Sequence, residues 1–294
     1  MSDRPLPADV AARIARARIA HARVRAPEAF RPRPGARLRA WGGLALVASV
    51  TAFAIWRLDL GFAQLWDGLG RLGFLIALMV PPSPGGYPGD IARAMLETVA
   101  MAFLGTLLSS TLSLPLGFLG ARNVVTNALA HFSLRRLFDS GRAIDSLVWA
   151  LFFISVVGLG PFAGMLALAA GDIGSLSKLY AEAIENAEVE QVEGVRATGA
   201  GPVQTAWLGY LPQVLPVILS HALFYFEGNV RSASILGVVG AGGIGMLLSE
   251  RIRAGDWPEA AFIILVILIA VALLDALSKE IRLRIVADPA RGRP

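Results

Sequence analysis

The stretch that decides the fold is Ala260–Leu274, which reads AAFIILVILIAVALL and carries no charged side chain. Further stretches without Asp, Glu, Lys or Arg are Ala40–Trp56, Thr98–Ala121, Ser146–Gly171, Ala197–Phe226 and Ser232–Ser249. A helix needs about 20 mostly apolar residues to cross the hydrocarbon core of a bilayer, so most of these stretches can span it, some with flanking residues. We therefore predict an all-α fold, a polytopic transmembrane helical bundle with about six spans.

The composition agrees with a membrane protein and excludes several classes of function. Of the 294 residues, 55% are hydrophobic and only 17% are charged, whereas soluble domains carry about 25% charged residues. Nothing is left for a large soluble catalytic domain, and we predict no enzymatic activity and no catalytic residues. The chain has no cysteine and three widely separated histidines, so we expect no disulfide and no metal site.

The distribution of positive charge predicts the orientation of the chain. Residues 1–39 contain ten arginines against three acidic residues, and the C-terminal end is also basic. Basic segments stay on the cytoplasmic side, so both termini are expected there and the number of crossings is even. The basic N-terminal segment is either a solvated tail that sets the topology or a helix that rests on anionic membrane lipid. The net charge of +5 needs no nucleic-acid partner to explain it.

Two topologies satisfy this rule. In the first, each uncharged stretch is one span, and residues 172–193 lie outside. In the second, Ser146–Glu188 holds two helices that meet near the turn signal Gly158-Leu159-Gly160-Pro161. The second also treats Gly237–Gly245, with five glycines in nine residues, as a bend, because each glycine costs a helix about 1 kcal/mol. The Pro/Gly cluster 81–86 is expected in an external loop within Leu58–Arg93.

A motif chooses between the topologies. From Glu193 the chain reads EGVRATGA, and Gly209-Tyr210-Leu211-Pro212 follows. This resembles the EAA loop of ABC importer permeases, in which EAA, three residues, Gly, nine residues and I-x-L-P follow in order. The Glu, the Gly six positions on and the Leu-Pro pair are in register, while Gly194 and Gly209 depart from the pattern. The matching or aligned positions are Glu193, Gly194, Ala197, Gly199, Leu211 and Pro212.

Further segments extend the resemblance to the permeases of phosphonate ABC importers. They are KLYAEAIEN from Lys178, LPQVLP from Leu211, YFEGNVR from Tyr225 and the glycine-rich run 237–245. The resemblance implies a homodimer of permeases, two cytoplasmic ABC ATPase subunits that bind ATP and Mg, and a periplasmic phosphonate-binding protein. It also implies the bacterial inner membrane and a cytoplasmic EAA loop. The expected parts are then a basic segment 1–39, a first span and periplasmic loop 40–90, a type I permease domain 91–284 and a tail 285–294.

The EAA loop has a mechanical interpretation that does not depend on the family. Ala183–Ala197 is rich in Ala and Glu and contains no proline, so it is expected to be helical. Gly199 and Gly201-Pro202 break this helix and start a second one. Two short crossed helices would form a stiff element that passes force from a cytoplasmic motor into the membrane. The alternative is a plain amphipathic connector between spans.

Charged residues inside the membrane are the second candidate site. Glu227, Asn229 and Arg231 lie between two uncharged stretches, and ions at membrane depth usually face a bundle interior or a cavity. Glu227 and Arg231 are four residues apart and could pair. They either line the translocation pathway or its gate, or form a structural pair that locks helices or a dimer seam. Asp172 and Lys178 are weaker candidates, expected at a helix end, and His221 is expected to pack between helices.

The glycine run is assigned to the same pathway through Gly240, Gly242 and Gly243. It lacks the lysine of a P-loop, so it is not expected to bind nucleotide. A bend with close helix packing is favoured.

Together these features predict an ATP-driven importer permease for phosphonate or a related phosphorus oxyanion. The alternative is an ion-coupled transporter or integral-membrane enzyme that uses Glu227 and Arg231. The sequence does not distinguish phosphonate, phosphite and phosphate-ester cargo.

Overall fold

The structure is a computed structural model that describes residue 25 and residues 36–58, 61–125 and 127–287. Every regular element in these residues is a helix, which confirms the all-α prediction. The chain divides into two compact units, residues 1–72 and 73–294, and each is described by itself. The basic segment 1–39 and the tail 285–294 lie almost entirely outside the described residues.

The first unit contains helix α2 (Ala36–Arg57) and the start of α3 (Phe62–Leu78). The side chains of Leu46, Val50 and Phe53 on α2 are all exposed, as expected for a helix that faces lipid. Helix α3 lies inside the segment 58–93 that the sequence assigned to an external loop, and the external location of this segment stays a prediction. Residues 79–87, which include the Pro/Gly cluster, are irregular. Seventeen residues, mostly apolar, are enough for α3 to form.

The second unit is a helical bundle. Its elements are α4 (Pro88–Gly120), α5 (Ala128–Gly141), α6 (Ser146–Val157), α7 (Pro161–Glu185), α8 (Val189–Ala197), α9 (Pro202–Thr205), the π-helical turn η2 (Ala206–Tyr210), α10 (Leu211–Val238), α11 (Gly243–Ala254) and α12 (Trp257–Ala287). The predicted break near Gly158 separates α6 from α7 and confirms the second topology in this respect. The helix predicted over 183–197 is instead divided at residues 186–188.

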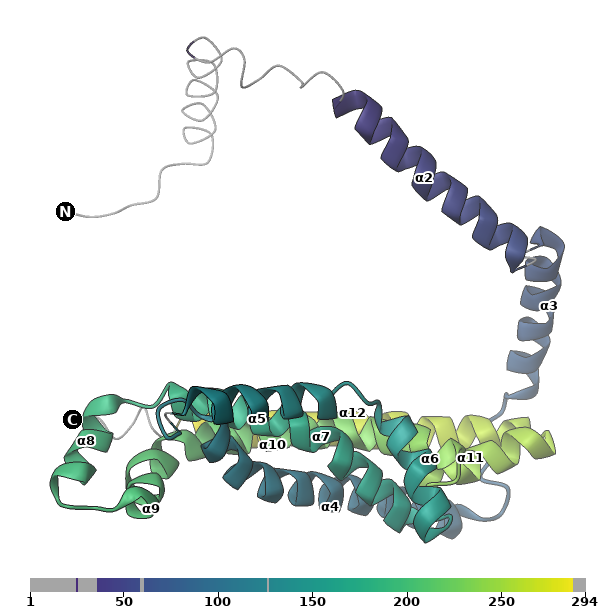
Figure 1. The fold of residues 1–294 in the computed structure, drawn as a ribbon. Helices are drawn as coiled ribbons and strands as arrows, with labels where there is room; N and C mark the ends of the chain where they lie inside the picture. The colour runs from purple at the N-terminus through teal and green to yellow at the C-terminus, as the bar shows by residue number, and fades with distance from the viewer. Residues whose placement is uncertain (1–24, 26–35, 59–60, 126, 288–294) are drawn as a thin grey trace, which may run out of the picture. The chain divides into compact units, whose positions relative to one another are not determined.

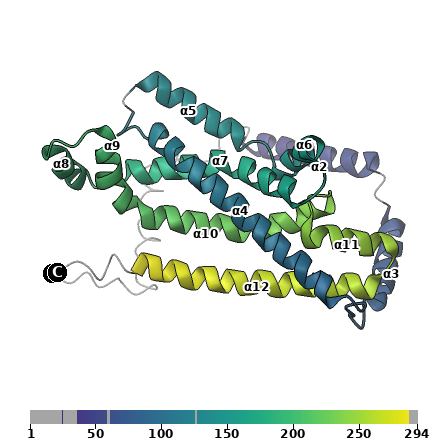
Figure 2. The same ribbon diagram turned by 90° about the horizontal axis from the view of Figure 1, so that it is seen from below.

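The long helices of the bundle lie side by side, and the two ends of the bundle differ (Figures 1 and 2). Helices α8 and α9 lie at one end, which we call the elbow end, where α12 also finishes. The opposite end, which we call the loop end, carries the start of α4, helix α11 and the start of α12. There the loop 79–87 is tied to α12, because the Ser83 amide donates to the Pro258 carbonyl at 3.1 Å.

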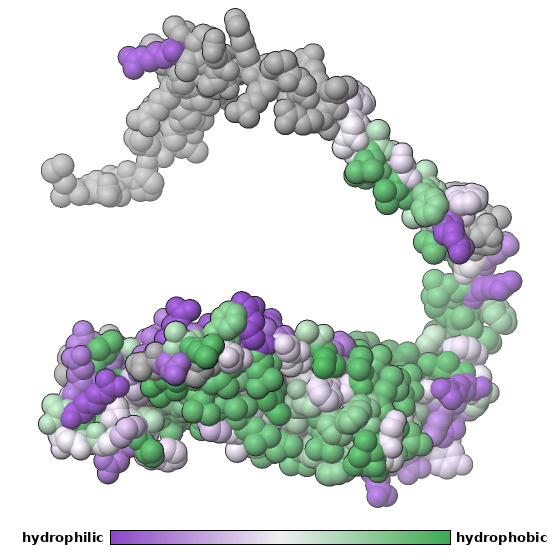
Figure 3. Space-filling view, in the orientation of Figure 1, coloured by the Kyte–Doolittle hydropathy of each residue, from purple (hydrophilic) through white to green (hydrophobic). Residues whose placement is uncertain are grey.

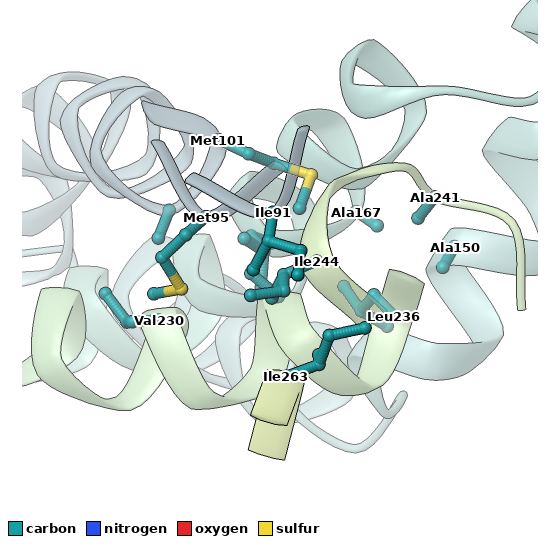
Figure 4. Close-up of a cluster of buried hydrophobic side chains, with 13 residues drawn as sticks. Ile91, Met95, Met101, Ala150, Ala167, Val230, Leu236, Ala241, Ile244 and Ile263 are labelled. Atoms are coloured by element: carbon teal, nitrogen blue, oxygen red, sulfur yellow. The ribbon is translucent and has the colours of Figure 1, made fainter. Parts of the chain in front are cut away.

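Glycines let the central helices α4 and α7 pack closely. A Cβ atom on Gly117 would lie 2.7 Å from Cβ of Tyr180, and one on Gly105 would lie 3.1 Å from the Met165 carbonyl oxygen. Because lipid provides no hydrophobic driving force between helices, small residues that allow close backbone approach are what stabilise such pairs. The buried core beside this contact is shown in Figure 4, where Ile91 and Met101 of α4 lie near Ala167 and Ala241.

The predicted bend in the glycine run separates α10 from α11 and spans only residues 239–242. It packs against the α6–α7 break, since the Gly160 amide donates to the Gly240 carbonyl at 3.0 Å. Thr98 of α4 holds its other side, because Oγ1 accepts from the Ile244 amide at 2.8 Å. Irregular backbone inside a membrane must have its polar groups paired by protein. The two breaks and Thr98 meet part of this need by pairing with one another.

Three helices in the described residues are long and apolar enough to cross a membrane, or four if the bent pair α5–α6 counts as one span. The predicted number of about six therefore stays a prediction. In the second unit, hydrophobic side chains cover the middle of the face shown in Figure 3, while hydrophilic ones gather toward its two ends. That pattern fits a bundle with apolar sides in lipid and both ends in water.

Candidate functional site

The first candidate site is the element that we call the elbow: α8, the turn 198–201 and α9. Gly199 in this turn has φ of +86°, a left-handed conformation that glycine adopts without strain. The Gly201 amide donates to Oε1 of Gln204 at 2.9 Å, which caps the start of α9. The sequence prediction of two short helices joined at these glycines is therefore confirmed.

One face of α8 anchors the elbow to the bundle. Val192 is only 2% exposed and belongs to a buried cluster with Tyr180, Tyr210 and Val214. The Gln213 side chain ties the two ends of the segment together: it accepts from the Glu188 amide at 2.9 Å and donates to the Gly209 carbonyl at 2.7 Å. Displacement of α8 would therefore also displace the start of α10.

The opposite face of α8 is open. With 3.6 residues per turn, Glu190, Gly194 and Ala197 point away from Val192, and all three are exposed, as is Glu193. A Cβ atom on Gly194 would have no neighbour within 4 Å. Large apolar side chains are also exposed on and after α9, with Val203 at 81% and Trp207 at 66%. The predicted coupling residues Leu211 and Pro212 form the first turn of α10.

The second candidate site lies in the middle of α10, and here the predicted ion pair was wrong. Glu227 does not pair with Arg231 but with Arg282 of α12. Arg231 donates from Nη2 to both carboxylate oxygens of Asp275 on α12, at 2.8 and 2.6 Å. The ion pair within α10 is replaced because α12 runs antiparallel beside α10 (Figure 2), which brings a partner of opposite charge to each residue.

Asn229 belongs to a different network. Its side chain is 5% exposed, and Nδ2 donates to Asp172 of α7 at 2.5 Å and to Oγ1 of Thr106 on α4 at 2.9 Å. The sequence analysis expected Asp172 at a helix end, but Asp172 lies in the middle of α7. A buried polar group is tolerated only when it is hydrogen-bonded, and this network joins α4, α7 and α10 at one point.

A groove with a volume of about 300 Å³ opens beside these residues. Its lining residues are Asp172, Phe224, Tyr225, Glu227, Gly228, Asn229, Arg231 and Ser232. The guanidinium of Arg231 already binds Asp275 through two hydrogen bonds. Part of the hydrogen-bonding capacity of Arg231 is therefore already used within the chain.

The predicted pathway residues occupy two places, since Gly240 and Gly242 belong to the bend between α10 and α11, and Gly243 is the first residue of α11. Gly242 and Gly243 are buried, and the Gly240 carbonyl is already bonded to Gly160. Gly240 also lines a smaller groove of about 240 Å³ together with Leu159, Met246 and Arg253. The structure at the bend is the close-packed arrangement that the sequence favoured.

Sequence reasoning missed the partners of the charges on α10. Asp275 and Arg282 are seven residues apart, which is two turns and hence one face of a helix. Asp275 directly follows the most apolar stretch of the chain, and that position was the signal available. Thr98 and Thr106 carried no comparable signal, because a threonine in an apolar helix is common. His221 lies partly buried on α10, and it lines a groove of about 710 Å³ beside the elbow.

Comparison of the chain with known protein families and known proteins shows which family it belongs to. Residues 113–284 match the family described as binding-protein-dependent transport system inner membrane component. The chain belongs to this family. The predicted resemblance to an ABC transporter permease is thereby confirmed, and we refer to the protein as the permease.

Two relatives narrow the class. The permease is 37% identical to the phosphite transport system permease protein PtxC of Stutzerimonas stutzeri, over 83% of this chain and 89% of that protein. It is 36% identical to the phosphate-import permease protein PhnE of Mycolicibacterium smegmatis, over 83% of this chain. The aligned region covers 46% of the mycobacterial protein, so the permease spans about half of that relative.

A solved structure supports the fold. A chain of the MetNI methionine ABC transporter in an inward-facing conformation matches with a TM-score of 0.61, over 69% of the permease and 99% of that chain. The sequence identity is 21%, so this likeness concerns the fold alone.

Proposed function

We propose that the permease is the membrane subunit of an ATP-driven importer for phosphonate or a related phosphorus oxyanion. In this proposal two copies of the permease form a homodimer in the bacterial inner membrane. Two ATPase subunits bind ATP and Mg on the cytoplasmic side, and a periplasmic binding protein delivers the cargo. The permease itself needs no cofactor, and its transport domain covers residues 91–284.

The observation that carries the proposal is the two-sided character of α8. One face, through Val192, is packed into the bundle, while Glu190, Gly194 and Ala197 on the other face are not covered by any element in the part of the chain that the structure describes. A helix placed in this way can receive a partner on its open face and transmit the movement through its packed face. We assign the open face to the ATPase, and we propose that the elbow and both termini lie in the cytoplasm.

The path from the elbow to the groove is a single element. Helix α10 begins directly after η2 at Leu211 and continues to Val238, so it passes both the elbow and the groove that contains Asn229. Movement of the elbow on ATP binding would therefore shift Glu227, Asn229 and Arg231 relative to Asp172 on α7, which would open or close the passage.

The exposure of the ion pairs supports a second copy. The side chains of Arg231 and Asp275 are 53% and 39% exposed in the single chain. Ions on a membrane-spanning helix are costly unless they face protein or water. A homodimer in which this side of α10 lines a central, water-filled passage would meet that need. Phosphorus oxyanion cargo is proposed from the named activities of the two relatives and from the phosphonate resemblance.

The experiment that tests the proposal compares two glycines with free space. Gly194→Trp places a bulky group on the open face of α8, and Gly89→Trp places the same group near the start of α4, where a Cβ atom also has no neighbour within 4 Å. Both variants are reconstituted with the ATPase and the binding protein, and uptake of radiolabelled phosphite or phosphonate is measured. We expect Gly194→Trp to abolish uptake and ATPase binding, and Gly89→Trp to retain the ATPase complex and ATP-dependent uptake.

Gly194→Ala is the conservative control, because it adds only a methyl group in open space. Both Gly194 variants should be inserted in the membrane like the wild type. Uptake by Gly194→Trp at the wild-type rate would contradict the coupling role of α8, and uptake by the wild type without the ATPase would contradict the whole proposal.

A further inference from the structure

Most glycines inside the long helices of the bundle have a packing explanation. A Cβ atom on Gly174 would lie 2.6 Å from the Phe138 carbonyl oxygen, and one on Gly237 would lie 2.6 Å from the Gly242 carbonyl oxygen. The nearest atom to a Cβ on Gly105, Gly117 and Gly164 would lie 3.0, 2.7 and 2.3 Å away. At these positions any larger residue would push two helices apart.

Gly228 in the middle of α10 is different. A Cβ atom at this position would meet nothing within 4 Å, apart from the backbone of its own helix turn. Glycine is the poorest helix former after proline, so it weakens α10 here without improving any contact within the chain. Among the glycines of α4, α7 and α10 beyond their first turns, all of which the structure describes, Gly228 alone has this free space.

Gly228 is one of the residues that line the groove of about 300 Å³. Gly228 lies beside Asn229, which is tied to Asp172 and Thr106, and one turn before Ser232. Phe224, which is 59% exposed, lines the same groove one turn earlier. Aromatic and hydrogen-bonded side chains thus define the walls of the groove, while Gly228 contributes only backbone to it.

From this arrangement we infer that Gly228 sets the width of the cargo passage and so limits the size of the oxyanion that crosses. The inference rests on the proposed function. The charged groups that line the groove already have partners within the chain, Glu227 with Arg282, Arg231 with Asp275 and Asp172 with Asn229, which weakens their binding to an anion. The width of the passage is then the property that selects the cargo. The class of cargo is a small phosphorus oxyanion whose organic substituent must pass the Gly228 backbone.

The test is a size series at one position with cargo of two sizes. Gly228→Ala and Gly228→Leu are reconstituted with the ATPase and the binding protein, and uptake of phosphite and of the larger 2-aminoethylphosphonate is measured. We expect Gly228→Ala to slow the larger cargo more than phosphite. Gly228→Leu should lower uptake of the larger cargo by about tenfold or more, the scale of discrimination by added methylene groups in a closed site, and lower phosphite uptake less.

Two further readouts separate this inference from a structural role. ATP hydrolysis stimulated by the binding protein, and the homodimer measured by size-exclusion chromatography with light scattering, should both match the wild type. Ala272→Leu is the matched control, because Ala272 is exposed on α12 between the exposed Leu268 and Leu273. That variant should transport both cargoes normally.

The outcomes are distinguishable. Equal uptake of both cargoes by Gly228→Leu and the wild type overturns the inference alone. Dissociation of the Gly228→Leu homodimer also overturns it, since Gly228 would then be a dimer contact. If the wild type moves neither cargo with all its partners present, the proposed function itself has failed.

Discussion

Two left-handed glycine turns in the permease use the same backbone conformation for opposite purposes. Gly199 in the elbow has φ of +86° and Gly242 in the bend between α10 and α11 has φ of +82°. A Cβ atom on Gly199 would meet nothing within 4 Å, whereas one on Gly242 would lie 2.7 Å from the backbone nitrogen of Pro161. The turn at Gly199 therefore leaves a surface open to a partner, whereas the bend at Gly242 packs against the first residue of α7 within the chain.

The largest expected effect is a difference in stability between variants of these two turns. Gly242→Ala should lower the free energy of unfolding by about 2–6 kcal/mol, because left-handed strain costs about 1–3 kcal/mol and overpacking costs a similar amount. Gly199→Ala carries the same strain without the collision and should cost about 1–3 kcal/mol. Thermal unfolding in detergent measures both. Equal losses of stability would mean that the bend is no more tightly packed than the elbow.

A smaller effect is expected at the hydrogen bond that holds the bend. Thr98→Val keeps the shape of the side chain but leaves the Ile244 amide without its partner at Oγ1, which costs about 1–3 kcal/mol for a buried donor. Thr111→Val on the same helix is the control, since Thr111 is exposed and its hydroxyl donates only to the Leu107 carbonyl within α4. The control should unfold within a few degrees of the wild type. If the two variants lose the same stability, Thr98 does not secure the bend.

The sequence predicted the local features of the fold well. Uncharged stretches became helices, and Gly158–Pro161, Gly199 and the glycine run all mark chain breaks, because glycine and proline act through the backbone of a few neighbouring residues. Helix α3 was missed because its seventeen residues lie between turn signals and carry Asp67 and Arg71. The break at residues 186–188 was also missed, since Ala and Glu on both sides favour a continuous helix.

The candidate pathway was less predictable than the elbow. The motif at Glu193 to Pro212 is continuous in the sequence, so its residues lie close together in space once α8 and α9 form. The pairs Glu227–Arg282 and Arg231–Asp275 depend on the register of α12 relative to α10 along the two helix axes. Helical spacing within α10 suggested a local pair instead, and side-chain pairing between helices is set by tertiary packing that no local pattern encodes.

The central claim is that the open face of α8 lies in the cytoplasm against an ATPase. The chain contains no cysteine, so Ala197→Cys and Gly89→Cys each provide a single label site at opposite ends of the bundle. A membrane-impermeant maleimide is applied to right-side-out and inside-out vesicles, with and without the ATPase. We predict that Ala197→Cys reacts only in inside-out vesicles and is shielded by the ATPase, while Gly89→Cys reacts only in right-side-out vesicles. Labelling of Ala197→Cys from the periplasmic side, or no shielding by a bound ATPase, would contradict the account.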